Sequence, residues 1–419
     1  MTAREHRAGE SPAPPLRTRC RTGVGQAIRL SILLTSCAFG QSFNQRGYLD
    51  ISTFSYPQAA PSDSGPVVSE AQLRYEAFYR FSPHLQLTSG FDFRADTHRQ
   101  VERELDFSWA DRQTKRAAAA VRRLSLTYSN GPVSIEAGKQ YIRWGKADIL
   151  NPTDRFAPQD FLNVVQTDFL AVTGVRMVIG NQGDTLELVW VPVFTPSRTP
   201  LLQQRWVVLP AGLPISDGGA RYPGGSQFGV RWNHTGAAEY SLSFYDGRSH
   251  LPLYEPTLNP VRYYPQMRMY GGDFAVPLSN VTIKGEAGYF TSTTRQSDEY
   301  LLYVLQLERQ QGEWSFTGGY AGEVVTNHRN ILNFAPDRGL SRAFLGRAGY
   351  TIDANRSLAF ETAIRQNGAG VYAKFIYSQA FGQHWRATAG VAVIDGEESD
   401  FLGQYFRNSY LLFGLRYSF

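Results

Sequence analysis

A two-residue alternation of apolar and polar side chains runs through most of this chain from residue 48 onward. The segment 281–289 reads VTIKGEAGY, so its odd positions are apolar or small and its even positions include Lys284 and Glu286. Successive side chains of a β-strand point to opposite faces, whereas an α-helix repeats every 3.6 residues. The pattern therefore predicts a mainly β fold whose strands each have one apolar and one polar face.

Eighteen segments carry this alternation, and most are nine to thirteen residues long. That length is close to what a tilted strand needs to cross a lipid bilayer. An even number of strands is also the rule for single-chain bacterial membrane barrels. The predicted strands cover 48–56, 72–81, 84–95, 118–129, 132–141, 169–180, 184–194, 226–234, 238–247, 266–277, 281–293, 299–309, 313–324, 341–352, 356–367, 369–381, 384–394 and 405–419.

The links between the predicted strands are alternately short and long. The short links carry Gly, Asn, Asp and Pro, for example Ser82-Pro83 and Asn130-Gly131, as tight turns require. The longest links are 57–71, 96–117, 142–168, 195–225, 248–265 and 325–340. Short turns at one end and long loops at the other are typical of outer-membrane barrels. We therefore predict an all-β, transmembrane, antiparallel up-and-down β-barrel of about 18 strands (16–18).

The last ten residues read YLLFGLRYSF and form an amphipathic strand that ends in an aromatic residue. Phe413, Leu415, Tyr417 and Phe419 share its apolar face. This ending resembles the terminal assembly signal of outer-membrane barrels, which implies recognition by the barrel assembly machinery. Physically, the last strand has to pair with the first to remove the free sheet edges. An ordinary C-terminal strand of a soluble sheet is the alternative.

Composition excludes several other classes of protein. No apolar run reaches the roughly 18 to 20 residues of a spanning helix, and the mean hydropathy is −0.32. Six of the 42 basic and two of the 37 acidic residues lie in residues 1–40, which leaves 36 basic and 35 acidic residues afterwards. The net charge of +5 is thus mainly a property of the N-terminal segment, and the sequence does not predict nucleic-acid binding.

Residues 1–40 have the features of a secretory signal peptide. An Arg-rich stretch precedes the apolar run Ala27–Ser36, and Ala38-Phe39-Gly40 supplies the small residues of a cleavage site. We predict a signal peptide at 1–40, a barrel at 41–419 and location in a bacterial outer membrane. Leu34-Thr35-Ser36-Cys37 also matches a lipobox, which would make Cys37 a lipidated N-terminus, and an unprocessed tail is a third interpretation. Because Cys20 and Cys37 are the only cysteines, the barrel has no thiolate for a metal site.

The loop at 142–168 combines apolar side chains that favour burial with charged side chains that require water or partners. Folding into the lumen would satisfy both groups, so we predict that this loop constricts the channel. Packing on the outer rim is the alternative. The apolar residues are Trp144, Ile149, Leu150, Phe156 and Phe161, and the charged ones, predicted to line the constriction, are Arg143, Lys146, Asp148, Asp154, Arg155 and Asp160.

The strand parity that puts Phe419 outside assigns many charged side chains to the lumen, where they avoid the lipid. The predicted inward bases are Arg74, Arg80, Arg94, Arg123, Arg176, Arg231, Lys284, Arg347, Arg365, Lys374 and Arg386. The predicted inward acids are Asp50, Glu76, Asp92, Glu136, Glu187, Glu286 and Glu361. This basic excess suggests a mild preference for anions. For any single residue, pairing across the strands is the simpler role.

The sequence around the loop contains a Gly-x-Gln at the end of a strand, followed by Trp144-Gly145 and by Asn151-Pro152-x-Asp154. These motifs resemble those of uncharacterised porin-like barrels and, more loosely, of alginate-export-type channels. The resemblance covers about a twentieth of the chain. It implies a passive channel for small hydrophilic solutes, surrounded by outer-membrane lipid and lipopolysaccharide, with homo-oligomers a further possibility.

Two other functions are compatible with such a barrel. One is a barrel enzyme of the hydrolase type, and the other is a structural or adhesive barrel whose lumen is closed by loops. The sequence has no Gly-x-Ser-x-Gly motif, no His-Glu-x-x-His motif and no phosphate-binding glycine loop. We therefore expect no enzyme activity, no cofactor and no metal.

Overall fold

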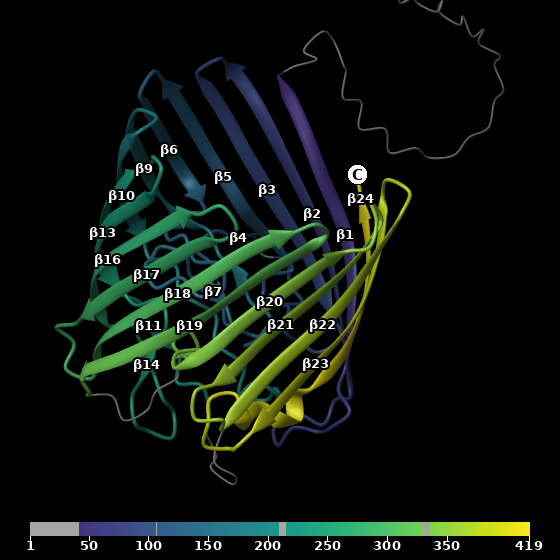
Figure 1. Cartoon of the computed structure of the whole chain (residues 1–419). Coiled ribbons are helices and arrows are strands. Elements are labelled where there is room, and N and C mark those ends of the chain that lie inside the picture. Colours follow the sequence, from purple (N-terminus) through teal and green to yellow (C-terminus); the bar gives the residue numbers. More distant parts are fainter. Residues whose placement is uncertain (1–41, 106, 209–214, 330–334) are drawn as a thin grey trace, which may run out of the picture. The chain divides into compact units, whose positions relative to one another are not determined.

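The computed structural model describes residues 42–105, 107–208, 215–329 and 335–419. The predicted signal peptide, with Cys20 and Cys37, lies outside the described residues. The described chain forms one antiparallel sheet that closes into a barrel (Figure 1). Closure joins the first and last strands, because β1 (Phe43–Ser55) pairs with β2 (Val67–Ser82) on one edge and with β24 (Tyr410–Ser418) on the other.

The barrel consists of 18 long strands, and each pairs with its neighbours in chain order. Between β2 and β24 these strands are β3 (Leu85–Asp96), β5 (Ala119–Asn130), β6 (Val133–Gln140), β9 (Val172–Gly180), β10 (Asp184–Val193), β12 (Gln227–His234), β13 (Glu239–Arg248), β16 (Gln266–Pro277), β17 (Thr282–Thr291), β18 (Glu299–Gln311), β19 (Trp314–Asn327), β20 (Ala343–Thr351), β21 (Arg356–Arg365), β22 (Gly370–Phe381) and β23 (Trp385–Gly396). The predicted fold and strand number are confirmed.

The remaining elements lie in the connections. They are the two-residue strands β4 (Phe107–Ser108), β7 (Gln159–Asp160), β8 (Asp168–Phe169), β11 (Ala220–Arg221), β14 (Leu253–Tyr254) and β15 (Arg262–Tyr263), and the short 3-10 helix η1 (Gly403–Asn408). No helix in the described ranges is long and apolar enough to span a membrane.

Four predicted strand starts were wrong by three residues or more, and one of them is that of β2, which begins at Val67 rather than at residue 72. The strand predicted at 405–419 starts only at Tyr410, because η1 occupies the preceding residues. The strand predicted at 169–180 is interrupted after Phe169, because β8 pairs with β7 and only β9 joins the barrel. The first strand begins at Phe43, five residues earlier than predicted. In each case the alternation is similar on both sides of the observed boundary, so the available pairing partner decides which residues enter the sheet.

The long and short connections lie at opposite ends of the barrel. Eight connections of two to four residues form one end, which we call the turn end. The other end, which we call the loop end, has all the long connections and one link of four residues, 366–369. The C-terminus lies at the turn end (Figure 1). The predicted alternation of short turns and long loops is thus confirmed.

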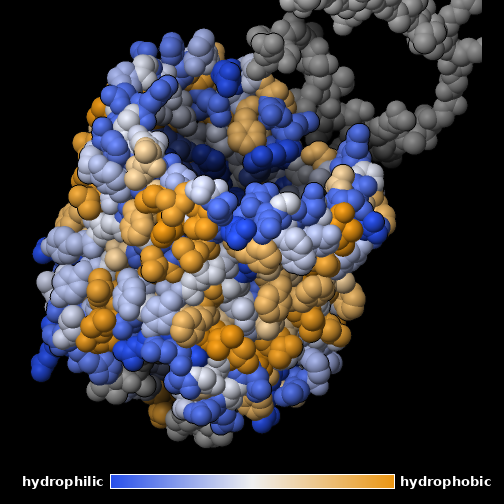
Figure 2. All heavy atoms as spheres, in the orientation of Figure 1, coloured by the Kyte–Doolittle hydropathy of each residue, from blue (hydrophilic) through white to orange (hydrophobic). Residues whose placement is uncertain are grey.

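The outer face of the barrel is apolar. Phe413 and Leu415 on β24 are about half exposed, as are Phe344 on β20, Phe360 on β21 and Phe375 on β22. Figure 2 shows hydrophobic residues gathered on the outer wall. Figure 2 also shows hydrophilic residues around a hollow at the end where the C-terminus lies. Since exposed apolar side chains of this number would be unfavourable in water, this face is the one that contacts lipid.

The last residue of the chain closes the barrel against Gly47 of β1. Backbone hydrogen bonds join Gly47 N to Phe419 O (2.9 Å) and Phe419 N to Gly47 O (3.0 Å). The Phe419 ring lies directly over Gly47, so a Cβ there would lie 2.5 Å from the ring and 2.6 Å from the carbonyl oxygen of Arg74. Residue 47 therefore has to be glycine for the Phe419 ring to pack against β1.

Replacing Gly47 with alanine is expected to weaken closure. The added methyl group displaces the Phe419 ring and the backbone of β2, and overpacking of this kind typically costs about 1–3 kcal/mol. The measurement is the fraction of refolded barrel that resists SDS at room temperature. Gly318→Ala is the matched control, because no atom lies within 4 Å of a Cβ at that strand position. Equal folded fractions for the two variants would contradict this account of closure.

Candidate functional site

The connection from β6 to β9, residues 141–171, folds into the barrel. Its atoms bond to side chains on the inner face of two strands, β10 and β18: the Trp144 indole N–H donates to Glu187 (2.8 Å), and the backbone N–H of Asp148 donates to Gln306 (3.1 Å). Glu187 and Gln306 are buried, whereas the preceding residue on each strand, Leu186 and Leu305, is exposed on the outer face. This connection, which we call the inner loop, therefore lies inside the lumen.

A single carboxylate on β17 fixes the first half of the inner loop. Glu286 accepts hydrogen bonds from the backbone N–H groups of Lys146 (3.0 Å), Ala147 (3.1 Å) and Thr153 (2.8 Å). The Thr153 hydroxyl (2.9 Å) and the Asn151 amide (3.4 Å) donate to it as well. The Glu286 side chain is buried, and among the described residues no cation pairs with it. Five donors from the loop thus take the place of a counter-ion.

Gly145 lets the loop approach this carboxylate. Its φ of +97° is a backbone conformation that side chains disfavour, and a Cβ at this position would lie 2.5 Å from both Glu286 oxygens. The Trp-Gly dipeptide noted in the sequence therefore has a physical function. The Trp144 ring packs against the Phe156 ring, with centroids 5.1 Å apart, and the Phe156 ring packs against that of Tyr245 at 4.9 Å. Gly145 leaves room for Glu286.

The inner loop extends toward the turn end of the barrel. The Lys146 ammonium group bonds to Glu239, the first residue of β13, at 2.5 Å. The Asp148 carboxylate pairs with Lys284, the third residue of β17, at 2.9 Å. Both partners lie close to short turns. The charged residues at this point of the loop are consequently paired with the wall and deep in the lumen.

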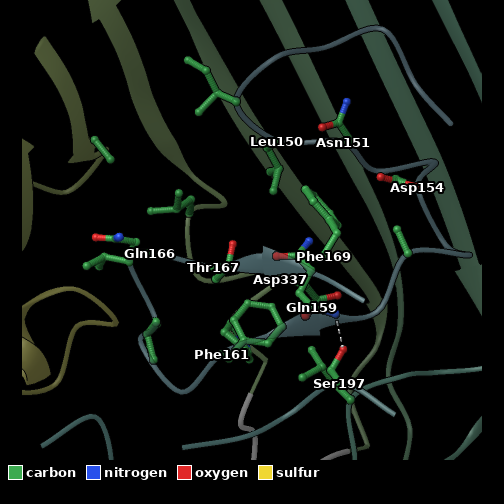
Figure 3. A pocket seen from close by; sticks show the side chains of 18 of the residues that line it. Leu150, Asn151, Asp154, Gln159, Phe161, Gln166, Thr167, Phe169, Ser197 and Asp337 are labelled. Carbon is green, nitrogen blue, oxygen red and sulfur yellow. Dashed lines mark hydrogen bonds between the residues drawn. The ribbon is translucent and has the colours of Figure 1, made fainter. Parts of the chain in front are cut away.

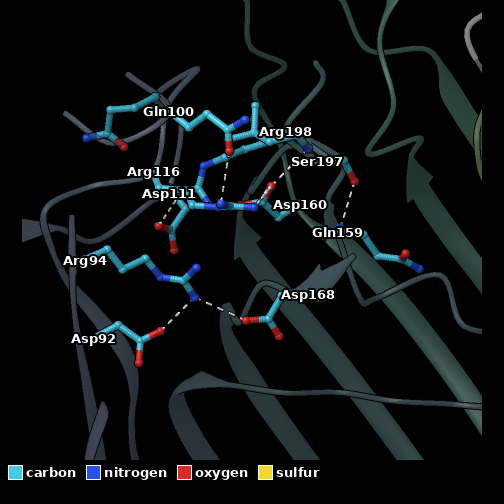
Figure 4. Close-up of polar contacts among 12 residues, drawn as sticks. Asp92, Arg94, Gln100, Asp111, Arg116, Gln159, Asp160, Asp168, Ser197 and Arg198 are labelled. Atoms are coloured by element: carbon cyan, nitrogen blue, oxygen red, sulfur yellow. Dashed lines mark hydrogen bonds and ion pairs between the residues drawn. The ribbon is translucent and has the colours of Figure 1, made fainter. Parts of the chain in front are cut away.

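The second half of the inner loop is a small hairpin formed by β7 and β8. On β7, Asp160 is buried and accepts from the guanidinium groups of Arg116 (2.9 Å) and Arg198 (3.2 Å), which belong to two other long connections (Figure 4). Burial opposes ionisation of Asp160, but the charges of Arg116 and Arg198 outweigh it and lower its pKa to about 2. Asp160 thus joins three loops at the loop end.

On β8, Asp168 faces a group of arginines from three adjacent wall strands. Its carboxylate lies 3.5 Å from Arg74, 3.3 Å from Arg94 and 2.9 Å from Arg122. Asp92, on the wall itself, bonds to the same three arginines at 2.7, 3.1 and 3.4 Å. Figure 4 shows Arg94 between the two carboxylates. The side chain of Asp168 is 39% exposed, whereas that of Asp92 is 5% exposed.

Sequence parity missed Arg122, although it assigned Arg123 to the lumen. The register of β3 with β5 shifts between Gly90 and Phe91, so Arg122 is the unpaired residue of a β-bulge. Arg122 and Arg123 consequently both bond to lumen carboxylates, Asp168 and Glu136. Nothing in the alternation marks this bulge.

Two further loop charges predicted for the site form pairs inside the loops. Arg143 hydrogen-bonds to Asp154, and its guanidinium group lies 3.5 Å from the centre of the Phe169 ring. Burial raises the pKa of Asp154 to about 6, against the opposing charge of Arg143. Arg155 pairs with Asp337 of the connection between β19 and β20 at 3.1 Å.

The wall arginines predicted to face the lumen are also mostly paired. Arg176 bonds to Glu187 (2.8 Å), Arg231 to Asp273 (2.7 Å) and Arg347 to Glu361 (2.9 Å). Arg386 lies opposite Arg416 in the β23–β24 register, and Arg416 pairs with Asp50 at 2.8 Å. These pairs limit the excess positive charge that the sequence suggested.

Two cavities flank the tip of the hairpin at 163–168. The first, of about 440 Å³, lies between the inner loop and the β20–β22 wall, and it combines apolar side chains such as Leu150 and Phe161 with polar ones such as Gln166 and Asp337 (Figure 3). The second, of about 410 Å³, lies toward the β1–β3 wall and is lined by polar residues that include Arg74, Arg94 and Asp168. Gln166 and Thr167 line both cavities, so the hairpin tip divides the space inside the barrel.

The described residues contain no group of three or more His, Cys, Asp or Glu side chains that could hold a metal ion. The sequence has acidic residues at Asp273 and in the run Asp395–Asp400, and within the described residues they do not form such a site. Asp273 instead pairs with Arg231, and Asp400 pairs with Arg365 at 2.9 Å.

Comparison with known proteins rests on structure alone. No family model matches the sequence, and no curated protein matches it. Solved porin structures do match. A BenF-like porin from Pseudomonas fluorescens is 9% identical with a TM-score of 0.53 and covers 90% of this chain and 98% of its own. OccAB4 from Acinetobacter baumannii is 10% identical with a TM-score of 0.52 and covers 91% of this chain and 100% of its own. OccK11 (OpdR) from Pseudomonas aeruginosa is 8% identical with a TM-score of 0.50, with 90% and 95% covered. The closed barrel of 18 strands and these matches together show that the chain has the fold of a porin.

Proposed function

We propose that this protein is a porin-like channel through which small hydrophilic solutes cross a bacterial outer membrane. The observation that carries the proposal is the space beside the inner loop, where the linings of two cavities of about 440 and 410 Å³ both include charged and polar side chains. An apolar outer face and a polar interior are what a passive aqueous channel needs. A barrel with a purely structural role does not need cavities with exposed charged side chains on both sides of the inner loop.

The inner loop is proposed as the constriction. Its anchors on Glu286, Gln306 and Lys284 keep it across the lumen rather than at the rim. Arg143 and Asp148, which are both 39% exposed at the side chain, line the first cavity and are available to passing solutes. Asp154 and Asp160 are buried and would instead keep the loop in shape.

Charge in the second cavity favours a mild preference for anions. Arg74, Arg94, Lys374 and Arg416 line it, against Asp50, Glu70 and Asp168. Lys374 faces this cavity without an ion pair among the described residues. The remaining expectations, an outer-membrane location with lipopolysaccharide around the barrel, delivery by the assembly machinery through β24, and association into oligomers, follow from this proposal and are tested with it.

Single-channel conductance of the refolded barrel in a planar bilayer tests the function. The wild type is expected to conduct, and a variant lacking 146–160 is expected to conduct several-fold more because the loop no longer occupies the lumen. The control is deletion of 256–260, an uncharged and mostly exposed stretch in the connection between β13 and β16. That deletion is expected to leave the conductance unchanged. A folded wild-type barrel that does not conduct would refute the channel and favour the structural or enzymatic alternative.

A further inference from the structure

Three arginines from adjacent strands converge on one carboxylate of the inner loop, Asp168, and a second carboxylate on the wall, Asp92, contacts the same three. Asp92 binds Arg74 through two hydrogen bonds (2.7 and 3.0 Å) and also contacts Arg94 and Arg122. The ring of Tyr48 supports Arg74 at 5.3 Å. A buried carboxylate on a rigid strand thus fixes the direction in which the three guanidinium groups point.

The second carboxylate of the cluster, Asp168, belongs to an element with much less backbone pairing than the wall strands. It begins β8, which consists of two residues and pairs only with the two residues of β7. It also lines the second cavity together with Gln166 and Thr167 of the hairpin tip. A movement of this tip would withdraw the Asp168 carboxylate without disturbing any strand of the barrel.

Charge explains why the cluster needs a second anion. Arg74, Arg94 and Arg122 carry three positive charges, and Asp92 neutralises one of them. The guanidinium side chains are 14, 17 and 15% exposed, so little water replaces a missing partner. Burial opposes ionisation of Asp168, but the hydrogen bond from Arg122 and the charges of Arg122, Arg94 and Arg74 hold the pKa of this carboxyl well below its usual range. The carboxylate therefore stays charged throughout the physiological pH range.

We propose that Arg74, Arg94 and Arg122 form a binding site for a small oxoanion, and that Asp168 occupies this site as a tethered carboxylate which the solute has to displace. The solute class is a carboxylate or phosphate of a size that fits the second cavity. Such a molecule reaches Arg74 and Arg94, which line this cavity, from the open side, where Asp168 is 39% exposed, and it reaches Arg122 by taking the place of the Asp168 carboxylate. Bidentate contacts with guanidinium groups suit both chemistries. The inference deepens the proposed channel function, because it gives that channel a specific anion site with an internal competitor.

The test measures binding of inorganic phosphate to the detergent-solubilised barrel by calorimetry, and its block of single-channel current in a bilayer. Asp168→Asn removes the competing charge but retains the size of the side chain. It is expected to lower the dissociation constant for phosphate about tenfold or more, as expected for charge-assisted hydrogen bonds that become available, and to shift the reversal potential toward anion preference. Adding Arg94→Gln to Asp168→Asn is expected to abolish most of the gain in affinity for phosphate.

Glu361→Gln is the matched control. Glu361 is also an inward carboxylate, but it pairs with one arginine, Arg347, and lines only the first cavity. Its replacement is expected to change phosphate binding less than twofold. Equal affinities of the wild type and Asp168→Asn in folded protein would overturn the proposal, as would an equal gain in Glu361→Gln.

Two further comparisons test the anion site even if the Asp168→Asn variant does not fold or the wild-type barrel does not conduct. If Asp168→Asn does not fold, Arg94→Gln in the wild-type background leaves Asp168 in place and is expected to weaken phosphate block severalfold; unchanged block overturns the proposal. If the wild-type barrel does not conduct at all, the channel function fails, whereas the calorimetric difference between the wild type and Asp168→Asn still decides whether the anion site exists.

Discussion

Replacing Glu286 with glutamine is expected to release the inner loop and to enlarge the channel. One carboxylate oxygen of Glu286 accepts from Thr153, and the other accepts from the N–H groups of Lys146 and Ala147 and from Asn151. A glutamine amide has only one accepting oxygen, so its NH₂ group would face N–H donors. Each buried donor left without an acceptor costs about 1–3 kcal/mol.

The measurement is the single-channel trace. The wild type is expected to stay almost always at one conductance level. Glu286→Gln is expected to spend about 10 to 100 times more time than the wild type in bursts of higher conductance, as 1.4 kcal/mol corresponds to a factor of ten. Gly145→Ala should give the same phenotype, because its methyl group would overlap the carboxylate at 2.5 Å. Glu136→Gln is the control, since Glu136 is an inward carboxylate that bonds to Arg123 and Ser125 of the wall. If Glu286→Gln and Glu136→Gln give the same traces, Glu286 is not the anchor.

Replacing Asp160 with alanine is expected to open the loop end of the barrel. The change removes one carboxylate from two buried guanidinium groups, those of Arg116 and Arg198. Arg116 keeps Glu70 and Arg198 keeps Asp111, so the cost should lie near the lower end of the 3–5 kcal/mol typical for a broken buried pair, about 3 kcal/mol. That energy raises the population of the open loops about 100-fold.

Limited proteolysis reports this opening, because Arg116 and Arg198 are trypsin sites that are 7% and 6% exposed in the closed state. Trypsin is expected to cleave the folded Asp160→Ala barrel after both residues much faster than the wild type. Asp184→Ala provides the comparison, because Asp184 forms an exposed pair with His234 at a short turn, and such pairs contribute little. Slow cleavage in both variants would argue against the three-loop junction.

The same junction should respond to acid. The folded-state pKa of Asp160 is lowered from 3.8 to about 2, since the charges of Arg116 and Arg198 outweigh the effect of burial. A group with a depressed folded pKa contributes stability above its unfolded pKa and loses that contribution as the pH falls through the folded value. In the wild type, pepsin is therefore expected to gain access to Phe161 and Leu162, which are buried, as the pH falls from about 4 to about 2.

The contacts inside the barrel also explain why the local sequence could single out the 142–168 loop but could not predict its contacts. Trp144, Phe156 and Asp154 stood out because a loop with such side chains is unsuited to water. Their partners, Glu187, Tyr245 and the N–H group of Trp144, are set by how the chain crosses the lumen. Glu286 was recognised as an inward acid, but its role as an anchor depends on donors more than 130 residues away.

The sequence by itself determined the barrel, the number of its strands, the sides of its wall and the closing strand with Phe419. These features depend on a two-residue period and on turn residues, which are local and repeat along the chain. Only the tertiary structure decided that η1 precedes β24, that a bulge turns Arg122 inward, and that Asp168 sits among three arginines. Those outcomes depend on register and on contacts between distant segments, because a shift of one residue in pairing reverses the direction of a side chain without changing the local pattern.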